Sequence, residues 1–138
     1  MKTVMCFGTF DLLHLGHIHY FKQAKKYGDY LLVVIARDST KEQQQKEAIF
    51  TEKERQELIS QLRLVDEVVL GDPQDHLKII EEKKPDVICL GYDHPIKEEE
   101  LAKELQKKNL FPIIQRMKPY RIKRHKGSRL RSLLFDNF

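Results

Sequence analysis

Two histidines lie three positions apart in a glycine-containing turn near the start of the chain. His14 and His17 close the stretch GTFDLLHLGH, and Gly16 between them lets both imidazole rings face one point without a bulky side chain intervening. The stretch follows an apolar run over residues 4–7 and precedes a segment with helical spacing, which is typical of a strand-to-helix turn. A helix N-terminus favours anions, and imidazole N–H groups add further donors. The pattern predicts a site for an anionic group such as a phosphate.

An alternating series of strands and helices must position this turn. The expected strands cover residues 2–7, 30–36, 65–70, 86–90 and 111–114, and the expected helices cover residues 17–27, 75–83 and 96–108, with another beginning at residue 51. The continuous apolarity of the second strand is expected of a parallel strand covered on both faces. The alternation predicts an α/β fold, with a doubly wound, Rossmann-like parallel sheet of five strands in the order 3-2-1-4-5 within a three-layer sandwich.

Three polar loops are expected to meet at one edge of this sheet, because the carboxyl ends of parallel strands lie together. They cover residues 8–17, 37–50 and 91–95. Residues 39–50 show no periodicity and carry few apolar anchors, so we expect a mobile loop there. The three loops together predict a single cleft.

The helix that begins at Thr51 carries an arginine in an unusual place. Thr51 and Glu54 have the spacing of a capping box. The expected buried stripe consists of Leu58, Ile59 and Leu62. Arg55 lies three to four residues before the first two of these, at the edge of the stripe, and therefore needs a partner. A bound phosphate and a surface ion pair with a neighbouring glutamate are the two interpretations.

Composition indicates one ordinary globular domain spanning residues 1–138. The chain is 41% hydrophobic and 33% charged, and it contains no apolar stretch of signal-peptide or membrane-spanning length, so we expect a cytoplasmic protein without a membrane partner. Cys6 and Cys89 each lie inside an apolar run, where buried thiols are common. We expect neither a disulfide nor a metal held by the protein, because no His, Cys and carboxylate cluster has zinc spacing.

The net charge of +4 is distributed unevenly. From Arg116 to the end the chain has eight Lys and Arg residues and one Asp, so this segment carries +7 and the rest about −3. Such a basic tail suits a polyphosphate, a solvated surface or a nucleic acid. An RNA-binding module is therefore an alternative, although such modules usually interleave aromatic residues with their cations and only Tyr120 lies between Arg116 and Gly127.

The first turn resembles the G-T/V-F-D-x-x-H-x-G-H pattern of the cytidylyltransferase-like nucleotidyltransferases, and every fixed position matches. This resemblance implies an enzyme that transfers a nucleoside monophosphate from a nucleoside triphosphate to a phosphate-bearing acceptor with release of pyrophosphate. The implied catalytic residues are His14, His17, Lys46 and Arg55. The implied nucleotide-binding residues are Gly8, Thr9, Phe10, His14, His17, Gly91, Asp93, Arg124 and Ser128.

The resemblance also implies roles for two aspartates and for the tail. Asp11 and Asp38 match positions near the acceptor substrate, and Asp11 is also expected to accept backbone hydrogen bonds that tie the turn together. The basic segment 116–138 is expected to fold over the active site. Its Arg124 and Ser128 resemble a family motif, but Arg129 stands where a further hydroxyl is common, which puts the register of Ser128 in doubt.

Two branches of the family fit the length of the chain. The segments Ala36–Asp38 and Lys84–Asp93 look more like the branch that joins ATP and FMN to give FAD than the branch that joins CTP and glycerol 3-phosphate to give CDP-glycerol. The first branch needs an apolar slot for an isoalloxazine ring, for which Phe10, Tyr92 and Tyr120 are candidates. The resemblance further implies Mg²⁺ arriving with the nucleotide, a homodimer, small-molecule substrates and no nucleic-acid partner.

Overall fold

The computed structural model describes residues 1–39 and 48–120 and contains one sheet of five parallel strands. The strands are β1 (Thr3–Gly8), β2 (Tyr30–Ile35), β3 (Glu67–Leu70), β4 (Val87–Leu90) and β5 (Ile113–Arg116). Their order is β3-β2-β1-β4-β5, which confirms the expected topology. Most of the expected loop at 39–50 and of the basic tail lies outside the described residues, as do Lys46, Arg124 and Ser128.

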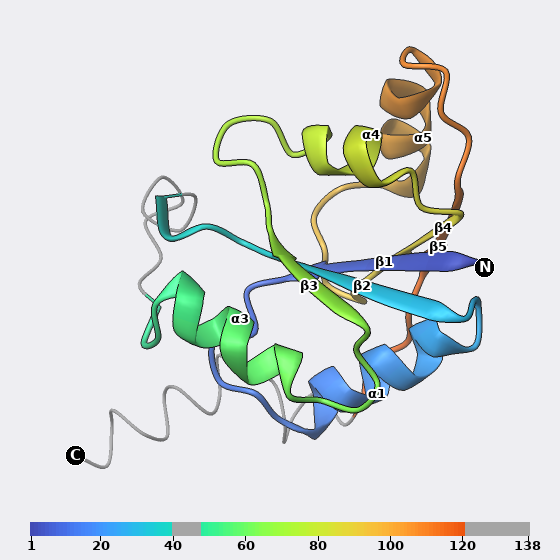
Figure 1. The fold of residues 1–138 in the computed structure, drawn as a ribbon. Coiled ribbons are helices and arrows are strands. Elements are labelled where there is room, and N and C mark those ends of the chain that lie inside the picture. The colour runs from blue at the N-terminus through green and yellow to red at the C-terminus, as the bar shows by residue number, and fades with distance from the viewer. Residues whose placement is uncertain (40–47, 121–138) are drawn as a thin grey trace.

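Helices cover both faces of the sheet and complete the expected three layers. The helices that flank the sheet are α1 (Leu15–Lys25), α3 (Glu52–Ser60), α4 (Lys78–Lys83) and α5 (Glu98–Gln106). Figure 1 shows α1 and α3 below the sheet and α4 and α5 above it. Within the described ranges, no helix combines the length and the apolar composition needed to cross a membrane.

The sheet separates two apolar cores. Side chains alternate along each strand, so Val4 and Cys6 of β1 belong to the core beneath α1 and α3, whereas Met5 belongs to the core beneath α4 and α5. All three side chains are fully buried. Burying an aliphatic side chain contributes about 1.5–3 kcal/mol. The two cores therefore fix which helix lies on which face, and so where each loop leaves the sheet.

Several boundaries and one buried face differ from those expected. β5 begins at Ile113 and runs to Arg116, because Pro112 has no N–H to donate to the neighbouring strand. In α3, Leu58 is 44% exposed, whereas Arg55 is only 1% exposed and shares the buried face with Ile59. The expected buried role of Leu58 is therefore wrong.

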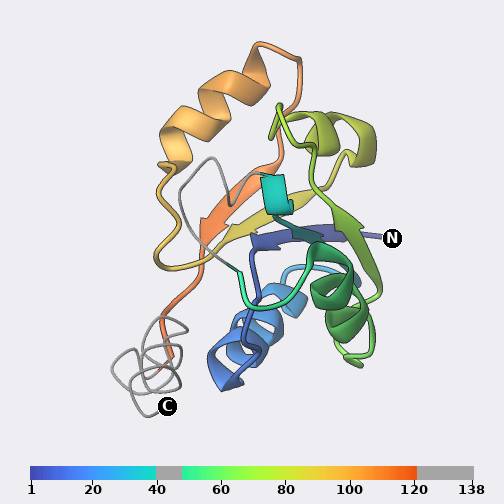
Figure 2. The ribbon, with the colours of Figure 1, turned by 90° about the vertical axis from the view of Figure 1, so that its left-hand side faces the viewer.

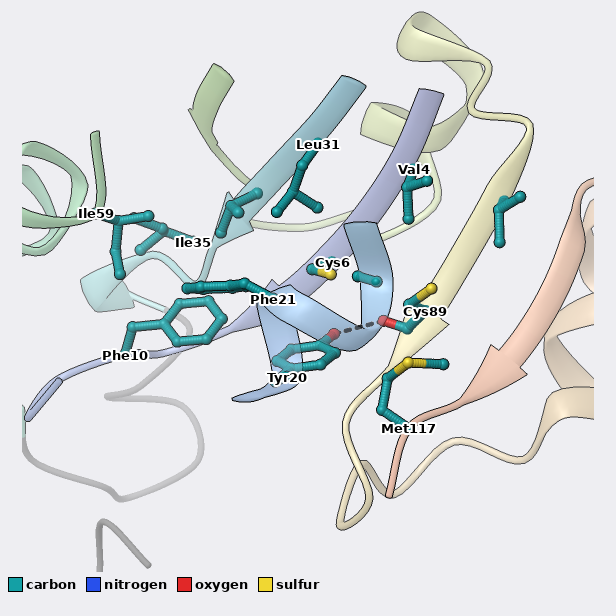
Figure 3. Packing of buried hydrophobic residues seen from close by; sticks show 13 residues of the cluster. Val4, Cys6, Phe10, Tyr20, Phe21, Leu31, Ile35, Ile59, Cys89 and Met117 are labelled. Atoms are coloured by element: carbon teal, nitrogen blue, oxygen red, sulfur yellow. Dashed lines mark hydrogen bonds between the residues drawn. The ribbon is translucent and has the colours of Figure 1, made fainter. Parts of the chain in front are cut away.

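Tyr20 of α1 holds β1 and β4 at the point where they diverge (Figure 3). The two strands pair in register as far as Cys6 and Cys89. The buried Tyr20 hydroxyl accepts a hydrogen bond from the Phe7 N–H at 3.2 Å and donates one to the Cys89 carbonyl. One side chain thus satisfies a backbone donor on one strand and a backbone acceptor on the other.

Candidate active site

The carboxyl ends of the strands lie at the edge of the sheet that Figure 2 faces. β1 and β4 are neighbours in the centre, but β1 leads into α1 on one face and β4 leads towards α5 on the other. Doubly wound sheets bind ligands at such a switch point, outside the carboxyl ends of the strands. The loops that follow Gly8 and Leu90 are therefore the candidate site.

His14 caps α1 with its own side chain. Its Nδ1 accepts a hydrogen bond from the Gly16 N–H at 3.0 Å, and its carbonyl accepts from the N–H groups of His17 and Ile18 at 3.0 and 3.3 Å. The Nδ1 of His17 accepts in turn from the His14 N–H at 3.3 Å, which completes a capping box made of two histidines. Three amides of this helix start are therefore used within the cap.

The cap determines which ring nitrogen carries the proton. A neutral imidazole has one N–H, and because Nδ1 accepts in both rings, the proton of the neutral form lies on Nε2. The two ring centroids lie 4.0 Å apart, with an angle of 33° between the planes. Burial and the neighbouring His14 lower the pKa of His17 to about 3. His17 is therefore an uncharged Nε2–H donor at neutral pH.

Gly8 and Phe10 support this pair from the core. Phe10 has a φ of 53°, in the left-handed region, and its side chain is buried. A Cβ on Gly8 would lie 2.5 Å from the Phe10 ring, so the close approach requires glycine. The Phe10 ring meets the His17 ring edge-on, with centroids 5.1 Å apart. The expected role of the Phe10 ring in a ligand slot is therefore corrected, because that ring is a core residue beneath His17.

Asp11 connects the turn to the segment that leads into α3. Its Oδ2 accepts from the Ile49 N–H at 2.7 Å and its Oδ1 accepts from the Phe50 N–H at 2.8 Å. The carboxylate is buried, and hydrogen bonds of this charge-assisted kind contribute about 1.5–3 kcal/mol each. Asp11 therefore accepts backbone hydrogen bonds as expected, but the amides belong to the segment before α3 and not to the turn itself.

Arg55 is buried beneath the same turn and points towards protein acceptors. Its Nε donates to the Phe50 carbonyl at 3.2 Å, and its Nη1 donates to the carbonyls of Thr9 and Ala36 at 3.0 and 2.9 Å. Its Nη2 forms an ion pair with Asp38 Oδ1 at 2.7 Å, and the Arg55 side chain is 0% exposed. This geometry differs from both expectations, a triphosphate ligand and a surface ion pair with glutamate, because the guanidinium is enclosed by these acceptors.

Asp38 joins the end of β2 to the start of α3. Its N–H donates to Glu52 Oε1 at 2.9 Å, and its Oδ2 accepts from the Glu52 N–H at 3.1 Å. Burial raises the pKa of Asp38, but the hydrogen bonds from Glu52 and Arg55 outweigh it and hold the pKa below its usual value. The side chain is 41% exposed, so an ionised carboxylate is available beside the switch point.

The loop after β4 is organised by Arg116, which was expected to belong to the basic tail. Arg116 is the last residue of β5, and its guanidinium binds carbonyls of this loop. The Asp93 carboxylate lies close to Gly91, and the Asp93 side chain is exposed. The Nδ1 of His94 accepts from the Ile96 N–H at 3.2 Å, and burial followed by the nearby Arg116 lowers the pKa of His94.

The aromatic residues proposed for a flavin slot lie in different surroundings. Phe10 is in the core, Tyr92 is half-buried in the loop after β4, and the Tyr120 ring packs against His19 of α1 with centroids 5.0 Å apart. Within the described ranges, these three rings therefore do not form one slot by themselves.

Three residues that shape the site were not identified from the sequence: Tyr20, Glu52 and Arg116. A tyrosine within a buried helical stripe needs a partner for its hydroxyl, which is a signal that sequence alone provides. Arg116 follows three residues of a short strand and Glu52 begins a helix, but their partners come from other segments. Their roles therefore depend on tertiary structure.

Comparison with known proteins places the chain among nucleotidyltransferase-like sequences. The family model described as cytidylyltransferase-like matches residues 5–132. The FAD synthase of Thermoplasma volcanium is 44% identical over 136 residues, which cover 99% of this chain and 96% of that protein. The FAD synthase of Methanohalophilus mahii is 44% identical over 121 residues, which cover 87% of this chain and 84% of the relative.

Solved structures agree on the fold. A Thermoplasma volcanium structure described as a lipopolysaccharide core biosynthesis protein is 48% identical, with a TM-score of 0.85 over 87% of this chain and 98% of that one. A pantoate-beta-alanine ligase from Francisella tularensis shares the fold at 19% identity, with a TM-score of 0.60 over 95% of this chain and 65% of the ligase. The match over most of the sequence, together with the turn that carries His14 and His17, shows that this chain belongs to the cytidylyltransferase-like family.

Proposed function

We propose that this protein is an FMN adenylyltransferase, which transfers AMP from ATP to FMN and releases pyrophosphate to give FAD. The observation that carries the proposal is the pair of mutually capped histidines at the switch point, whose Nε2–H groups suit phosphate oxygens. The substrate pair rests on the relatives named FAD synthase, such as the Thermoplasma volcanium protein, which is 44% identical over 99% of this chain.

The reaction needs positioning and charge stabilisation more than covalent help from the protein. A phosphate oxygen of FMN forms a bond to the α-phosphorus of ATP, and the bond from that phosphorus to the oxygen bridging the β-phosphate breaks. The electron pair leaves with pyrophosphate. His14 and His17 would donate to the α- and β-phosphate oxygens, and these hydrogen bonds strengthen as charge builds on the leaving group.

The other site residues take supporting roles in this proposal. Lys46, Arg124 and Ser128 are proposed triphosphate ligands, and the backbone of Gly8 and Thr9 is proposed to approach the phosphates. Gly91 and Asp93 are proposed to contact the base and ribose. Asp11 and Asp38 border the acceptor. Arg55 is proposed to act by holding Thr9 and Asp38 in place, since its guanidinium binds both directly.

Mg²⁺ is proposed to arrive with the nucleotide. Among the described residues, no three His, Cys, Asp or Glu side chains gather so as to hold a metal, and both Asp11 oxygens accept backbone N–H groups. These residues fit a cation held mainly by the phosphates, whose charge it would neutralise. A homodimer with small-molecule substrates completes the proposal.

A direct assay distinguishes the two branches and the binding-module alternative. Purified protein is incubated with ATP or CTP, Mg²⁺, and FMN or glycerol 3-phosphate, and FAD, CDP-glycerol and pyrophosphate are quantified. We expect FAD to form at least about tenfold faster than CDP-glycerol, since a site shaped for one base leaves polar groups unpaired with another. Faster CDP-glycerol synthesis would overturn the substrate pair. RNA binding without pyrophosphate release would overturn the proposal that the protein is an enzyme.

A further inference from the structure

Arg116 gathers the backbone of one loop around a single guanidinium. Its Nη1 donates to the carbonyls of Gly91 at 3.0 Å, Tyr92 at 3.4 Å and His94 at 2.9 Å. Its Nη2 donates to the Ile96 carbonyl at 2.6 Å. Four carbonyls within six residues therefore converge on one side chain. Only a planar fork with several donors can satisfy acceptors in so many directions at once.

Glu98 fixes the orientation of that fork. Its Oε1 accepts from Arg116 Nη2 at 2.7 Å and from Nε at 3.1 Å. Glu98 is the first residue of α5, so the guanidinium joins the end of β5, the loop after β4 and the start of α5. The Arg116 side chain is 27% exposed, which means that the ion pair itself contributes little stability and its geometry is the more important result.

The converging carbonyls determine where the amides of the loop point. Every peptide bond in the described residues is trans, so the N–H of each planar peptide points opposite to its carbonyl. Because the carbonyls of Gly91 and Tyr92 face Arg116, the N–H groups of Tyr92 and Asp93 face away from it. This loop follows the carboxyl end of β4, and the turn that carries His14 and His17 follows the carboxyl end of the neighbouring parallel strand β1, so both lie at the same edge of the sheet.

We propose that Arg116 is a positioning residue that sets the Gly91–Ile96 loop in the conformation that recognises the nucleoside part of the nucleotide, through the N–H groups of Tyr92 and Asp93. The proposal rests on the proposed function, because it assumes that a nucleotide binds at the switch point. It divides the site into two parts. The histidine pair holds phosphates, and the loop shaped by Arg116 holds the base and ribose.

The division can be tested by separating nucleoside binding from phosphate binding. Dissociation constants for ATP, CTP and inorganic tripolyphosphate are measured by calorimetry for the wild-type protein, Arg116→Lys and Arg116→Met. Arg63→Met is the matched control, because Arg63 is exposed and its replacement removes the same charge. We expect Arg116→Met to raise the dissociation constant for the preferred nucleotide by about tenfold or more, since displaced recognition groups lose their geometry. Tripolyphosphate binding should change less than about twofold, because His14 and His17 keep their cap.

The conservative variant supplies the second readout. Arg116→Lys keeps the charge but not the fork, so it should weaken nucleotide binding almost as much as Arg116→Met while still binding tripolyphosphate. Full recovery of nucleotide affinity by lysine, an unchanged nucleotide affinity in both variants, or an equal loss of nucleotide and tripolyphosphate binding would each overturn the proposal. A wild-type protein that binds neither ATP nor CTP would instead refute the proposed function, and the wild-type titration alone would show this.

Discussion

Two arginines use the same chemistry at opposite sides of the switch point, but they organise different amounts of the chain. Arg55 binds carbonyls from three separate segments, those of Thr9, Ala36 and Phe50. The carbonyls bound by Arg116 belong to one short loop. The Arg55 side chain is 0% exposed, whereas that of Arg116 is 27% exposed.

The two guanidinium groups therefore stabilise different parts of the molecule. Arg55 joins the ends of β1 and β2 to the segment before α3, so its loss leaves carbonyls from three segments without this donor. Arg116 gives a local loop its shape, and water can replace part of its hydrogen bonding. We therefore expect Arg55 to matter for folding and Arg116 to matter for recognition.

The largest expected effect is on stability. Arg55→Met should lower the free energy of unfolding by about 3 kcal/mol or more, because it removes four hydrogen bonds of a fully buried, charged side chain, and a hydrogen bond to a charged group contributes about 1.5–3 kcal/mol. Arg116→Met should cost about 1 kcal/mol, since the Arg116 side chain is 27% exposed and water can replace part of its hydrogen bonding. Urea unfolding followed by circular dichroism measures both, with Arg63→Met as the control. Equal losses of unfolding free energy in the two variants would contradict the claim that Arg55 matters more than Arg116 for folding.

The next largest effect is on catalysis, and it distinguishes the role of His17 as a phosphate donor from its role in the cap of α1. Asparagine at position 17 can mimic Nδ1 as an acceptor for the His14 N–H, whereas glutamine can place a donor near Nε2. His17→Asn should therefore lower kcat by about a hundredfold or more with little change in melting temperature, and His17→Gln should retain more activity. Steady-state rates of pyrophosphate release provide the measurement. Higher activity in His17→Asn than in His17→Gln would show that His17 acts mainly as part of the cap.

The Tyr20 hydroxyl connects β1 to β4, and its removal should have an intermediate effect on stability. Tyr20→Phe leaves the Phe7 N–H and the Cys89 carbonyl without their shared partner, and we expect a loss of about 1–2 kcal/mol in unfolding free energy. Amide hydrogen exchange should accelerate at Phe7. Unchanged stability and exchange would show that the hydroxyl does not hold β1 to β4.

The smallest expected effect is a dependence of the unfolding free energy on pH, which arises from His17. The pKa of His17 is about 3 in the folded protein, below its usual value, so between pH 6.5 and 5 the unfolded state binds more protons and stability falls as pH falls. The slope from one such group is at most about 1.4 kcal/mol per pH unit. The lowered pKa of His94 adds to it in the same direction. His17→Asn should flatten the unfolding free energy measured across this range, and an unchanged slope would contradict the neutral state of His17.

Much of the fold could be predicted because each strand is a short apolar run between turn signals. The two core faces follow from the same pattern, and the exposed Leu58 shows its limit, since helical spacing alone did not distinguish Leu58 from Arg55 as the buried residue. The shift of β5 to Ile113–Arg116 follows from Pro112, a signal present in the sequence. The strand order followed from the packing rules for right-handed crossovers in a doubly wound sheet.

The position of the site could be predicted from the sequence, but its hydrogen-bond network could not. The residue types and spacing of the turn with His14 and His17 were enough to predict an anion site. The use of both Nδ1 atoms in a cap, however, depends on backbone geometry. The partners of Arg55 lie 5 to 46 residues away in the chain, and those of Arg116 lie 18 to 25 residues away. Contacts over such separations are set by tertiary packing, which periodicity does not encode.

The most direct test of the central claim follows the α-phosphate of ATP. Wild-type protein is incubated with FMN, Mg²⁺ and ATP labelled at the α-phosphate, and the products are separated by chromatography. We expect the label to appear in FAD with one pyrophosphate released per FAD, and we expect His17→Asn to slow this transfer by about a hundredfold. Label recovered as free AMP or retained in ATP, with no labelled FAD, would contradict it.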